Sequence, residues 1–284
     1  MSETGGVLYV VATPIGNLGD LSQRAIETLR TVDLIAAEDT RHSRPLLQHY
    51  GIRTPLQSCH EHNEAQVSPR LVEQLQAGQR IALISDAGTP LVSDPGYQLV
   101  RAAIEAGVPV LAVPGPSALV AALSVSGLPT DRFRFEGFLP AKAGARRERL
   151  QALAAETATL VFYESSHRIE ACLADMAAAF GDARHAVLAR ELTKRFEQTE
   201  RGALSHLRQW LGADANRRKG EFVVMVQGAE AATGQDAAET RRILELLLKQ
   251  LPVKQAAAIA AEITGERRNA LYQLALELGN DESE

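Results

Sequence analysis

Short, uninterrupted apolar segments that alternate with amphipathic stretches limit what this chain can fold into more than any other feature. The segments occupy residues 7–12, 34–37, 81–85 and 108–113. The spacing of apolar residues predicts helices at residues 21–32, 44–50, 66–77 and 96–105. Strands that are apolar throughout, rather than at every second position, are typical of a parallel sheet with helices on both faces. The first part of the chain is therefore predicted to form an α/β lobe.

A second series of the same kind begins after Pro129. Strands are predicted at residues 159–163, 186–189 and 222–226, and helices at residues 146–155, 168–180 and 203–211. We therefore expect an α/β protein with two lobes, residues 1–117 and 118–229, and the cleft between the lobes is the usual place for a ligand.

The C-terminal part, residues 230–284, differs in kind. Small residues at 228–238 predict a linker, and residues 239–278 carry only helical patterns, broken before Pro252 and at Gly265. Its last part is a helix, a glycine turn and a second helix that opens with Arg267 and Arg268, loosely like a helix-turn-helix. A docking or dimer-packing role is the preferred interpretation of this helical module, and contact with RNA is the alternative.

Composition narrows the class of protein. The 284 residues are 45% hydrophobic and 23% charged, which is typical of a globular chain. There is no run of about 18 apolar residues and no signal-peptide pattern, so we expect a cytoplasmic protein with no membrane partner. Cys59 and Cys172 lack the spacing of a disulfide scaffold or a thiolate metal site. The net charge of -5 argues against general binding to nucleic acid, DNA included, but allows a local basic surface.

Three loops with special backbone follow predicted strands of the first lobe. They are Thr-Pro-Ile-Gly-Asn-Leu-Gly-Asp at 13–20, a twelve-residue loop with two glycines and two prolines at 85–96, and Val-Pro-Gly-Pro-Ser at 113–117. Open α/β sheets bind ligands at such strand ends. Neither G-x-G-x-x-G nor G-x-x-x-x-G-K-[ST] is present, so the usual NAD and NTP sites are excluded. Ser117 is expected to cap the following helix rather than to act as a nucleophile.

Two further clusters of polar residues follow predicted strands of this lobe. In Ala-Glu-Asp-Thr-Arg, residues 37–41, the neighbours Glu38 and Asp39 point in opposite directions if extended, so one is expected to cap the next helix and the other to face the cleft. The segment Cys-His-Glu-His-Asn-Glu, residues 59–64, lacks a zinc-binding spacing. We expect His60 and His62 to contact a polar substrate rather than a metal ion.

The second lobe carries two basic stretches. One contains Lys142, Arg146, Arg147 and Arg149, and the other contains Arg217, Arg218 and Lys219. Either stretch alone is consistent with an ordinary solvated face. Two of them on one lobe of an acidic chain predict a local surface for an anionic partner.

Ten motifs between residues 8 and 226 closely resemble the ribosomal RNA small subunit methyltransferase I family of the tetrapyrrole methylase superfamily. In order they are LYVVATPIGNLGDLS, AEDTR, HEHNE, SDAGTPLVSDPG, PGPSA, GLPTDRF, EGFLPAK, YESSHR, RELTKRFE and RRKGEFV. The segment KQAAAIAAEITGERRNALYQLAL is similar to the C-terminal helical module of that family.

This resemblance implies a two-lobed fold with parallel and mixed sheets and S-adenosylmethionine bound between the lobes. It also implies methylation of the 2′-hydroxyl of a cytidine in the decoding region of 16S rRNA, within the 30S small ribosomal subunit, by a homodimer. Because corrin- and porphyrin-modifying relatives share the fold, a small tetrapyrrole-like substrate is the alternative. A ribosome-associated binding module without enzymatic activity is a third possibility.

The resemblance also assigns roles to individual residues. Those expected at the cofactor are Pro14, Gly88, Thr89, Pro90, Leu91, Val92, Ser93, Ser117, Ala118, Tyr163, Glu164, Met225 and Val226. Thr89 stands where the superfamily usually has Asp, which puts a carboxylate contact there in doubt. With RNA as the substrate, the histidine segment and the two basic stretches, rather than the resemblance, supply the residues expected at the RNA: His60, His62, Asn63, Lys142, Arg146, Arg147, Arg217, Arg218 and Lys219.

No metal ion is expected in the reaction. Asp39 and Glu191 are the candidate bases for the ribose hydroxyl, because both lie in strand-end motifs that are expected to face the cleft. Arg41 and Lys194 are the candidates to orient phosphate or to stabilise the alkoxide.

Overall fold

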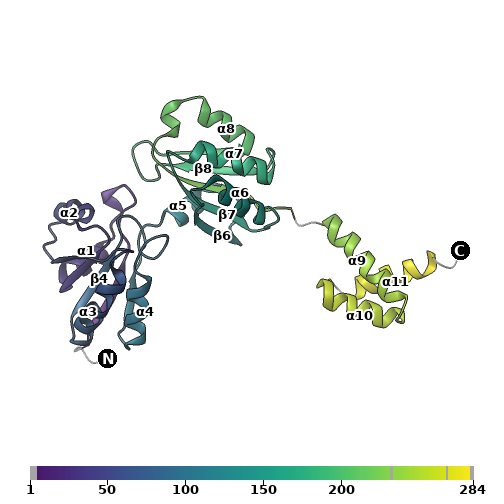
Figure 1. The fold of residues 1–284 in the computed structure, drawn as a ribbon, viewed down its shortest axis with the longest axis horizontal. Helices are drawn as coiled ribbons and strands as arrows, with labels where there is room; N and C mark the ends of the chain where they lie inside the picture. Colours follow the sequence, from purple (N-terminus) through teal and green to yellow (C-terminus); the bar gives the residue numbers. More distant parts are fainter. Residues whose placement is uncertain (1–4, 231–232, 267, 282–284) are drawn as a thin grey trace. The chain divides into compact units, whose positions relative to one another are not determined.

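The computed structural model describes residues 5–230, 233–266 and 268–281, and the chain divides into two compact units, Met1–Gly228 and Ala229–Glu284. The first unit contains two five-stranded sheets, one in each lobe (Figure 1). The α/β class with parallel and mixed sheets and a separate helical part is confirmed. None of the described helices combines the length and apolar character needed to cross a membrane.

The sheet of the first lobe is entirely parallel, as predicted. Its strands follow the order β3-β2-β4-β1-β5. They are β1 (Val7–Val11), β2 (Leu34–Ala37), β3 (Leu56–Ser58), β4 (Arg80–Ile84) and β5 (Val110–Val113). The helices are α1 (Gln23–Thr31), α2 (Thr40–His49), α3 (Glu64–Gln76) and α4 (Tyr97–Glu105), with a 3-10 turn at Leu18–Asp20.

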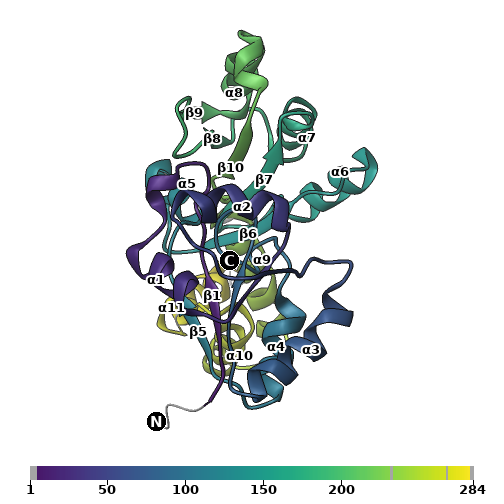
Figure 2. The ribbon, with the colours of Figure 1, turned by 90° about the vertical axis from the view of Figure 1, so that its left-hand side faces the viewer.

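Apolar residues on both faces of this sheet explain its position inside the lobe. Ile35 and Ala82 pack with α1 and α2 on one face, whereas Leu8, Ile81 and Leu83 pack with α3 and α4 on the other. Figure 2 shows α1 on one side of β1 and α3 and α4 on the other. The short edge strand β3 was not predicted, because its three residues are only half-buried and form no apolar run.

The sheet of the second lobe is mixed. Its order is β6-β7-β10-β8-β9, and only the pair β6–β7 is parallel. The strands are β6 (Phe133–Phe138), β7 (Thr159–Ser165), β8 (His185–Arg190), β9 (Gln198–Ala203) and β10 (Glu221–Val226). The helices are α5 (Ala118–Ser126), α6 (Ala143–Ala152), α7 (Ile169–Phe180) and α8 (Leu204–Gly212), with a 3-10 turn at Ala215–Arg218.

The two faces of this second sheet have different partners. Phe162, Leu188 and Val224 pack with α6, α7 and α8 in the largest apolar cluster. The opposite face packs with α5 and with Ile15 from the first lobe. A residue of the loop after β1 is therefore part of the core of the second lobe, which fixes that loop beside the second sheet.

The second unit contains α9 (Thr233–Leu248), α10 (Val253–Thr264) and α11 (Arg268–Asp281). The predicted breaks are confirmed, because α10 starts directly after Pro252 and ends at Gly265, whose φ is +74°. The predicted linker at 228–238 is wrong in its second half, since α9 already begins at Thr233. Residues 231 and 232 of that linker, and Arg267 at the start of the last helix, lie outside the described residues.

Alanine residues let the three helices of this unit approach closely. Its core consists of Leu244, Ala256, Ala257, Ala260, Leu271, Ala275 and Leu278. Small side chains of α10 face the leucines of α9 and α11, so the unit has an apolar core of its own.

Candidate functional site

The loops that follow β1, β4 and β5 are joined into one surface at the carboxyl edge of the first sheet. The N–H of Thr13 donates to Gly88 O at 2.8 Å, and the N–H of Gly88 donates to Thr13 O at 3.1 Å. The hydroxyl of Thr89 donates to Pro116 O at 3.0 Å. Because β4, β1 and β5 are neighbours in a parallel sheet, the three special loops meet there.

Backbone strain is concentrated in two loops, one in each lobe. Leu91 and Ser93 have φ values of +72° and +66°, and Glu191 and Thr193 have φ values of +52° and +66°. Each such residue costs about 1–3 kcal/mol relative to ordinary backbone, and strain of this kind clusters at ligand sites. Both loops border the cavities described next.

A cavity of about 440 Å³ lies between these loops and the second sheet. This volume is within the roughly 300–1,000 Å³ of small-molecule sites. Both lobes line it, with Ile15, Glu38, Asp86, Ala87, Gly88, Thr89, Val92, Ser93, Asp94, Ser117, Ala118, Phe138, Tyr163, Glu164, Ser165, Ser166, Ala189, Leu192, Gly220, Glu221, Phe222 and Val223. We call it the first cavity.

Acidic groups dominate the polar part of the first cavity. Glu38, Asp86, Asp94 and Glu221 contribute to its wall, and the described residues that line it include no Lys, Arg or His. Such a wall favours a ligand with positive charge and disfavours one with phosphates. Apolar side chains such as Ile15 complete the wall.

Hydrogen bonds between two strand-end loops position these carboxylates. Glu38 Oε2 accepts from the N–H of Asp86 at 3.2 Å, and Asp86 Oδ1 accepts from the N–H of Asp39 at 3.1 Å. Burial raises the pKa of Glu38. Burial, together with the charges of Glu38 and Asp86, raises the pKa of Asp94 to about 6, although a hydrogen bond with Ser85 acts in the opposite direction. A cation in the first cavity would relieve this mutual repulsion.

Tyr163 forms part of the wall on the second sheet. Its Oη accepts from the N–H of Leu119 at 3.1 Å, at the start of α5, and its ring packs edge-on against Phe135 and Phe138. Burial raises the pKa of this phenol. Ser117 occupies the N-cap position of α5 as predicted, but its side chain makes no cap hydrogen bond, so the predicted capping bond is wrong.

Eight of the residues predicted at the cofactor line the first cavity. They are Gly88, Thr89, Val92, Ser93, Ser117, Ala118, Tyr163 and Glu164. The carboxylate of Glu164 is fully buried beside Arg168 and Cys172, next to α7, so this residue offers the cavity its backbone. The burial of Cys172, with Glu164 nearby, raises the pKa of its thiol and makes it unreactive.

The structure places the other five predicted cofactor residues elsewhere. Pro90 is buried and Leu91 packs on the core beneath the loop, so both lie behind the wall. Met225 is buried against α5, and Val226 packs on the far face of the sheet. The antiparallel strand β10 approaches the cavity by its first residues, 221–223, together with the preceding Gly220, and not by its last ones. Pro14 borders a second, adjoining cavity.

This second cavity has a volume of about 480 Å³. It is lined by Pro14, Ile15, Gly16, Leu18, Arg41, His42, Ser43, Pro45, Leu46, Ser85, Asp86, Ala87, Lys194 and Glu221. Four of these residues, Ile15, Asp86, Ala87 and Glu221, also line the first cavity. The two cavities therefore share a wall.

The predicted catalytic residues form two ion pairs at the second cavity. Arg41 Nη2 lies 2.8 Å from Asp39 Oδ2, and Lys194 Nζ lies 2.9 Å from Glu191 Oε1. Lys194 Nζ also lies 2.8 Å from Glu221 Oε2. The two cations line the second cavity, whereas Asp39 and Glu191 line neither cavity.

Both predicted bases are held in their ionised form. The side chain of Arg41 donates to Asp39 and keeps the pKa of that carboxyl well below its usual range, and Asp39 also caps α2 by accepting from the N–H of Arg41. Burial alone would raise the pKa of Glu191, but hydrogen bonds from Lys194 and from the N–H of Glu221 outweigh it and lower that pKa. The expected division of labour between neighbours is confirmed, with Asp39 as the cap and Glu38 at the cavity.

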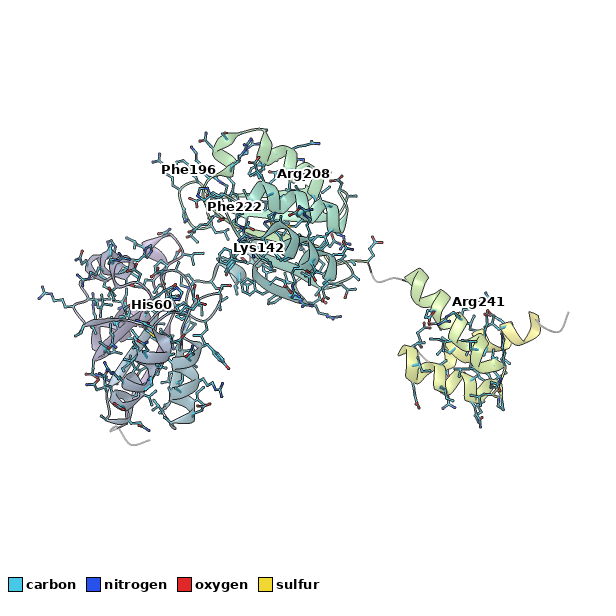
Figure 3. All side chains as sticks on the ribbon, viewed as in Figure 1. His60, Lys142, Phe196, Arg208, Phe222 and Arg241 are labelled. Atoms are coloured by element: carbon cyan, nitrogen blue, oxygen red, sulfur yellow. The ribbon has the colours of Figure 1, made fainter. Side chains whose placement is uncertain are left out.

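The histidine cluster lies in the first lobe, where Figure 3 labels His60. Asn63 Oδ1 accepts from the N–H of His60 at 2.8 Å, and Glu64 is buried and accepts from the N–H of Leu99, the third residue of α4. The rings of His60 and His62 lie 6.0 Å apart. His60, Asn63 and Glu64 thus hold the starts of α3 and α4. In the part of the chain that the structure describes, no group of acidic, His or Cys side chains is arranged to bind a metal ion.

The first basic stretch largely contacts its own lobe. Lys142 precedes α6 and is exposed. Arg146 is buried and pairs with Asp175 at 2.6 Å, and Arg147 pairs with the same carboxylate at 3.3 Å. Lys142 and Phe222 lie in the same lobe (Figure 3). Arg146 therefore joins α6 to α7 rather than projecting from the surface.

The second basic stretch is also engaged. The guanidinium of Arg217 stacks 4.5 Å from the ring centre of Trp210, and Arg218 pairs with Glu170 at 3.3 Å. Lys219 Nζ donates to Asn216 at 3.1 Å. The contacts of Arg217 and Arg218 hold the Ala215–Arg218 turn against α8 and α7, respectively.

Sequence reasoning missed the acidic wall. Asp86 and Asp94 lie in the loop after β4, which was singled out for its glycines and prolines and not for its carboxylates. A usable signal was present, because a carboxylate directly after a buried parallel strand is exposed at the ligand edge of the sheet. To predict that the first residues of β10 line the first cavity, one must know that this strand is antiparallel, which apolar periodicity does not reveal.

Comparisons with known proteins agree with this architecture. The chain matches the profile of the Tetrapyrrole (Corrin/Porphyrin) Methylases over residues 7–208 and that of the RsmI C-terminal HTH domain over residues 234–279. Uroporphyrin-III-C-methyltransferase from Thermus thermophilus has the same fold, with a TM-score of 0.56 and 20% identity over 78% of this chain and 94% of that one. Diphthine synthase also shares it, with a TM-score of 0.57 and 17% identity over 79% and 90% of the two chains.

Two relatives are similar to this chain over almost their whole length. The ribosomal RNA small subunit methyltransferase I of Pseudomonas aeruginosa PAO1 is 58% identical over 276 residues, which are 96% of this chain and 98% of that protein. The protein of the same name from Escherichia coli O157:H7 is 55% identical over 272 residues, which are 96% and 95% of the two chains. The chain therefore belongs to the tetrapyrrole methylases and, among them, to the ribosomal RNA small subunit methyltransferase I family.

Proposed function

We propose that this protein transfers the methyl group of S-adenosylmethionine to the 2′-hydroxyl of a cytidine in the decoding region of 16S rRNA, within the 30S subunit. Membership of its family makes it an S-adenosylmethionine-dependent methyltransferase. The observation that carries the proposal is a pair of adjoining cavities, one acidic and one with cationic side chains, which share a wall. Methyl transfer needs adjoining sites for the donor and the acceptor, since the two must meet.

The first cavity fits the cofactor by charge as well as by size. S-adenosylmethionine carries a sulfonium and an ammonium group against a single carboxylate, so a wall with Glu38, Asp86 and Asp94 and without cations suits it. Gly88 adopts a φ of +85°, and a Cβ there would lie 3.3 Å from Ile15 Cγ2. The backbone can therefore approach a ligand closely at this point, which a side chain would hinder.

The bound cofactor supplies an electrophilic methyl group, and the protein then has to align the ribose oxygen and remove its proton. Alignment alone accounts for up to about 7–11 kcal/mol of barrier lowering. Asp86 is the carboxylate of the first lobe that lies on the shared wall. We therefore assign to it the role of the base that accepts the proton of the ribose hydroxyl. The predicted bases Asp39 and Glu191 then act indirectly, since they hold Arg41 and Lys194 at the second cavity.

A tetrapyrrole-like substrate has less support. The structures of tetrapyrrole-modifying enzymes resemble this chain at about one fifth identity, which reflects the fold alone. The relatives at 55–58% identity over nearly the whole chain are named as ribosomal RNA methyltransferases.

A homodimer is part of the proposal. Leu111, on the edge strand β5, is 47% exposed, and Val120 and Val125 on α5 are 61% and 39% exposed. Exposed apolar residues on an edge strand and on a helix are suited to burial against a second copy. A solution mass of twice 30.6 kDa is expected in light scattering, and a monomeric mass would contradict this part of the proposal.

The function is tested with methyl-labelled S-adenosylmethionine and three acceptors, namely unmethylated 30S subunits, naked 16S rRNA and a tetrapyrrole precursor. Labelled RNA is then digested to nucleosides. We expect label in 2′-O-methylcytidine, and only when 30S subunits are the acceptor. Label in the tetrapyrrole alone would mean that the substrate is assigned wrongly although the fold and cofactor are right.

A further inference from the structure

The second cavity is not needed to hold the cofactor, so its contents are a separate question. At about 480 Å³ it is as large as the first cavity, and the two share Ile15, Asp86, Ala87 and Glu221. A molecule in the second cavity can meet, at this shared wall, a methyl group presented from the first. The second cavity is therefore placed to hold the methyl acceptor.

Its charge differs from that of the first cavity. Arg41 and Lys194 line the second cavity, and neither lines the first. Lys194 Nζ has three protons, of which the contacts to Glu191 and Glu221 use two, so one donor remains. Arg41 binds Asp39 through Nε and Nη2, which leaves Nη1 for another anion. The wall of the second cavity thus offers positively charged hydrogen-bond donors, which ion pairs hold in position.

The packing of Lys194 shows that its position is built in. Gly16 has a φ of +146°, and a Cβ at this residue would lie 2.5 Å from Lys194 Cγ and 2.6 Å from its Cε. The aliphatic stem of Lys194 therefore rests directly on the loop after β1 of the other lobe. The strained residues Glu191 and Thr193 belong to the same segment, which indicates that the backbone is held in an unfavourable form to place this side chain.

We propose that the second cavity is a pocket for one nucleotide of the RNA substrate, taken out of its strand. The phosphate lies against Lys194 and Arg41, and the ribose lies at the wall that carries Asp86. This inference rests on the proposed function. A cavity of this volume accommodates a single nucleotide, in keeping with recognition of RNA through bases that are splayed out of the strand. Leu18, Pro45 and Leu46 provide apolar contact for the base.

Two variants test the pocket by different means. Lys194→Met removes the charge, and Leu18→Trp fills the space from a position that is 43% exposed and therefore tolerates a larger side chain. Arg101→Met is the matched control, because Arg101 is also an ion-paired residue, bound to Glu105 at 2.7 Å, and lies outside both cavities. Neither Lys194 nor Leu18 lines the first cavity.

Three readouts are taken for each protein: the affinity for S-adenosylmethionine by calorimetry, contact with cytidine 5′-monophosphate by saturation-transfer NMR without cofactor, and single-turnover methylation of saturating 30S subunits. We expect both variants to bind the cofactor within twofold of wild type, to lose at least half of the NMR signal and to methylate at least tenfold more slowly. Arg101→Met should match wild type in all three.

The outcomes separate this inference from the function on which it rests. If the wild type labels 30S subunits and both variants retain its rate and its nucleotide contact, the pocket is assigned wrongly while the function stands. If the wild type labels no RNA, the proposed function fails and the nucleotide pocket with it. If both variants lose cofactor binding, the division into two separate cavities is wrong.

Discussion

The two cavities share Ile15, Asp86, Ala87 and Glu221, but the rest of their walls differ in charge. In the first cavity, no cation among the described lining residues neighbours Glu38, Asp86 or Asp94, and burial raises the pKa of Glu38 and Asp94. In the second, each cation is paired with a carboxylate. The first wall is therefore suited to bind a cation, and the second to hold donors in place for an anion.

This difference has a consequence for specificity. A molecule with several phosphates is repelled by the first cavity, and a sulfonium ion gains little from the second. Donor and acceptor are thus sorted by charge before they meet at Asp86. The first of the following variants changes the shared wall, and each of the others changes one cavity and leaves the other intact.

The largest effect is expected at the shared wall. Asp86→Asn keeps an oxygen that can accept from the N–H of Asp39 but cannot take a proton from the ribose hydroxyl. We expect single-turnover methylation to fall by about 10²–10⁴-fold, the usual contribution of a general base, with cofactor affinity changed by less than tenfold. The methylation rate should fall less in Asp39→Asn and Glu191→Gln, because those carboxylates only hold Arg41 and Lys194 in place. If Asp86→Asn kept the wild-type rate while Glu191→Gln was much slower, the role of base would pass from Asp86 to Glu191.

A smaller effect is expected where the two lobes touch at the second cavity. Gly16→Ala places a methyl group against the stem of Lys194, whose Nζ is tied to two carboxylates, so the side chain has to move. A shift of about 1 Å in a positioning group costs on the order of 10²-fold, and we expect methylation of 30S subunits to slow by about 10–100-fold. Gly19→Ala in the same loop is the control, because Gly19 lines neither cavity.

Cofactor affinity is the second readout for this pair of variants. Calorimetry should give both of them the wild-type affinity for S-adenosylmethionine, since Gly16 lies on the second cavity alone. Weaker cofactor binding in Gly16→Ala, with unchanged turnover at saturation, would place the effect in the first cavity instead.

The first cavity is tested through its pH dependence. The pKa of Asp94 is about 6 in the folded protein, above the ordinary 3.8, so folding favours the protonated form. This contribution to stability is fully present below pH 3.8 and is lost as the pH rises through 6. A bound cation prefers the ionised carboxylate, so affinity for S-adenosylmethionine should rise with pH, by up to about tenfold from pH 5 to 7, and level off above pH 7.

Asp94→Asn should remove most of this dependence. Calorimetric titrations at pH 5, 6 and 7 are the measurement, and a small slope is expected to remain because the pKa of Glu38 is also raised. The free cofactor changes its own charge little in this range. An affinity that is constant with pH in the wild type would mean that Asp94 does not face the cofactor.

The regions that sequence patterns predict well are those where one physical effect dominates. Buried strands such as β1 and β4 are apolar throughout because helices cover both faces, and this made the parallel sheet recognisable. The edge strands β3, β6 and β9 were missed, since exposed or half-buried residues leave no continuous apolar run in them.

The candidate site was predictable only in part, for a related reason. Loop composition located Gly88 and Ser93, because special backbone at a strand end is visible in the sequence. The side of β10 that reaches the first cavity depends on its antiparallel pairing, and the burial of Arg146 depends on Asp175, which is 29 residues away. Neither relation is local, so a basic stretch was interpreted as a surface although one of its members is structural.

The smallest effect is expected from the exposed cation of the second cavity. The side chain of Arg41 is 89% exposed, so water and salt weaken any contact it makes with phosphate. Arg41→Met should lower the affinity for 30S subunits by about two- to tenfold at low salt and reduce the slope of log affinity against log salt by about 1. The wild type and Arg101→Met should share the steeper slope. Asp39 stays ionised at neutral pH without Arg41, and it still accepts from the backbone N–H of residue 41, so α2 keeps its cap and the change is confined to one charge. An unchanged salt slope would therefore remove Arg41 from the phosphate contact and leave Lys194 to hold the nucleotide.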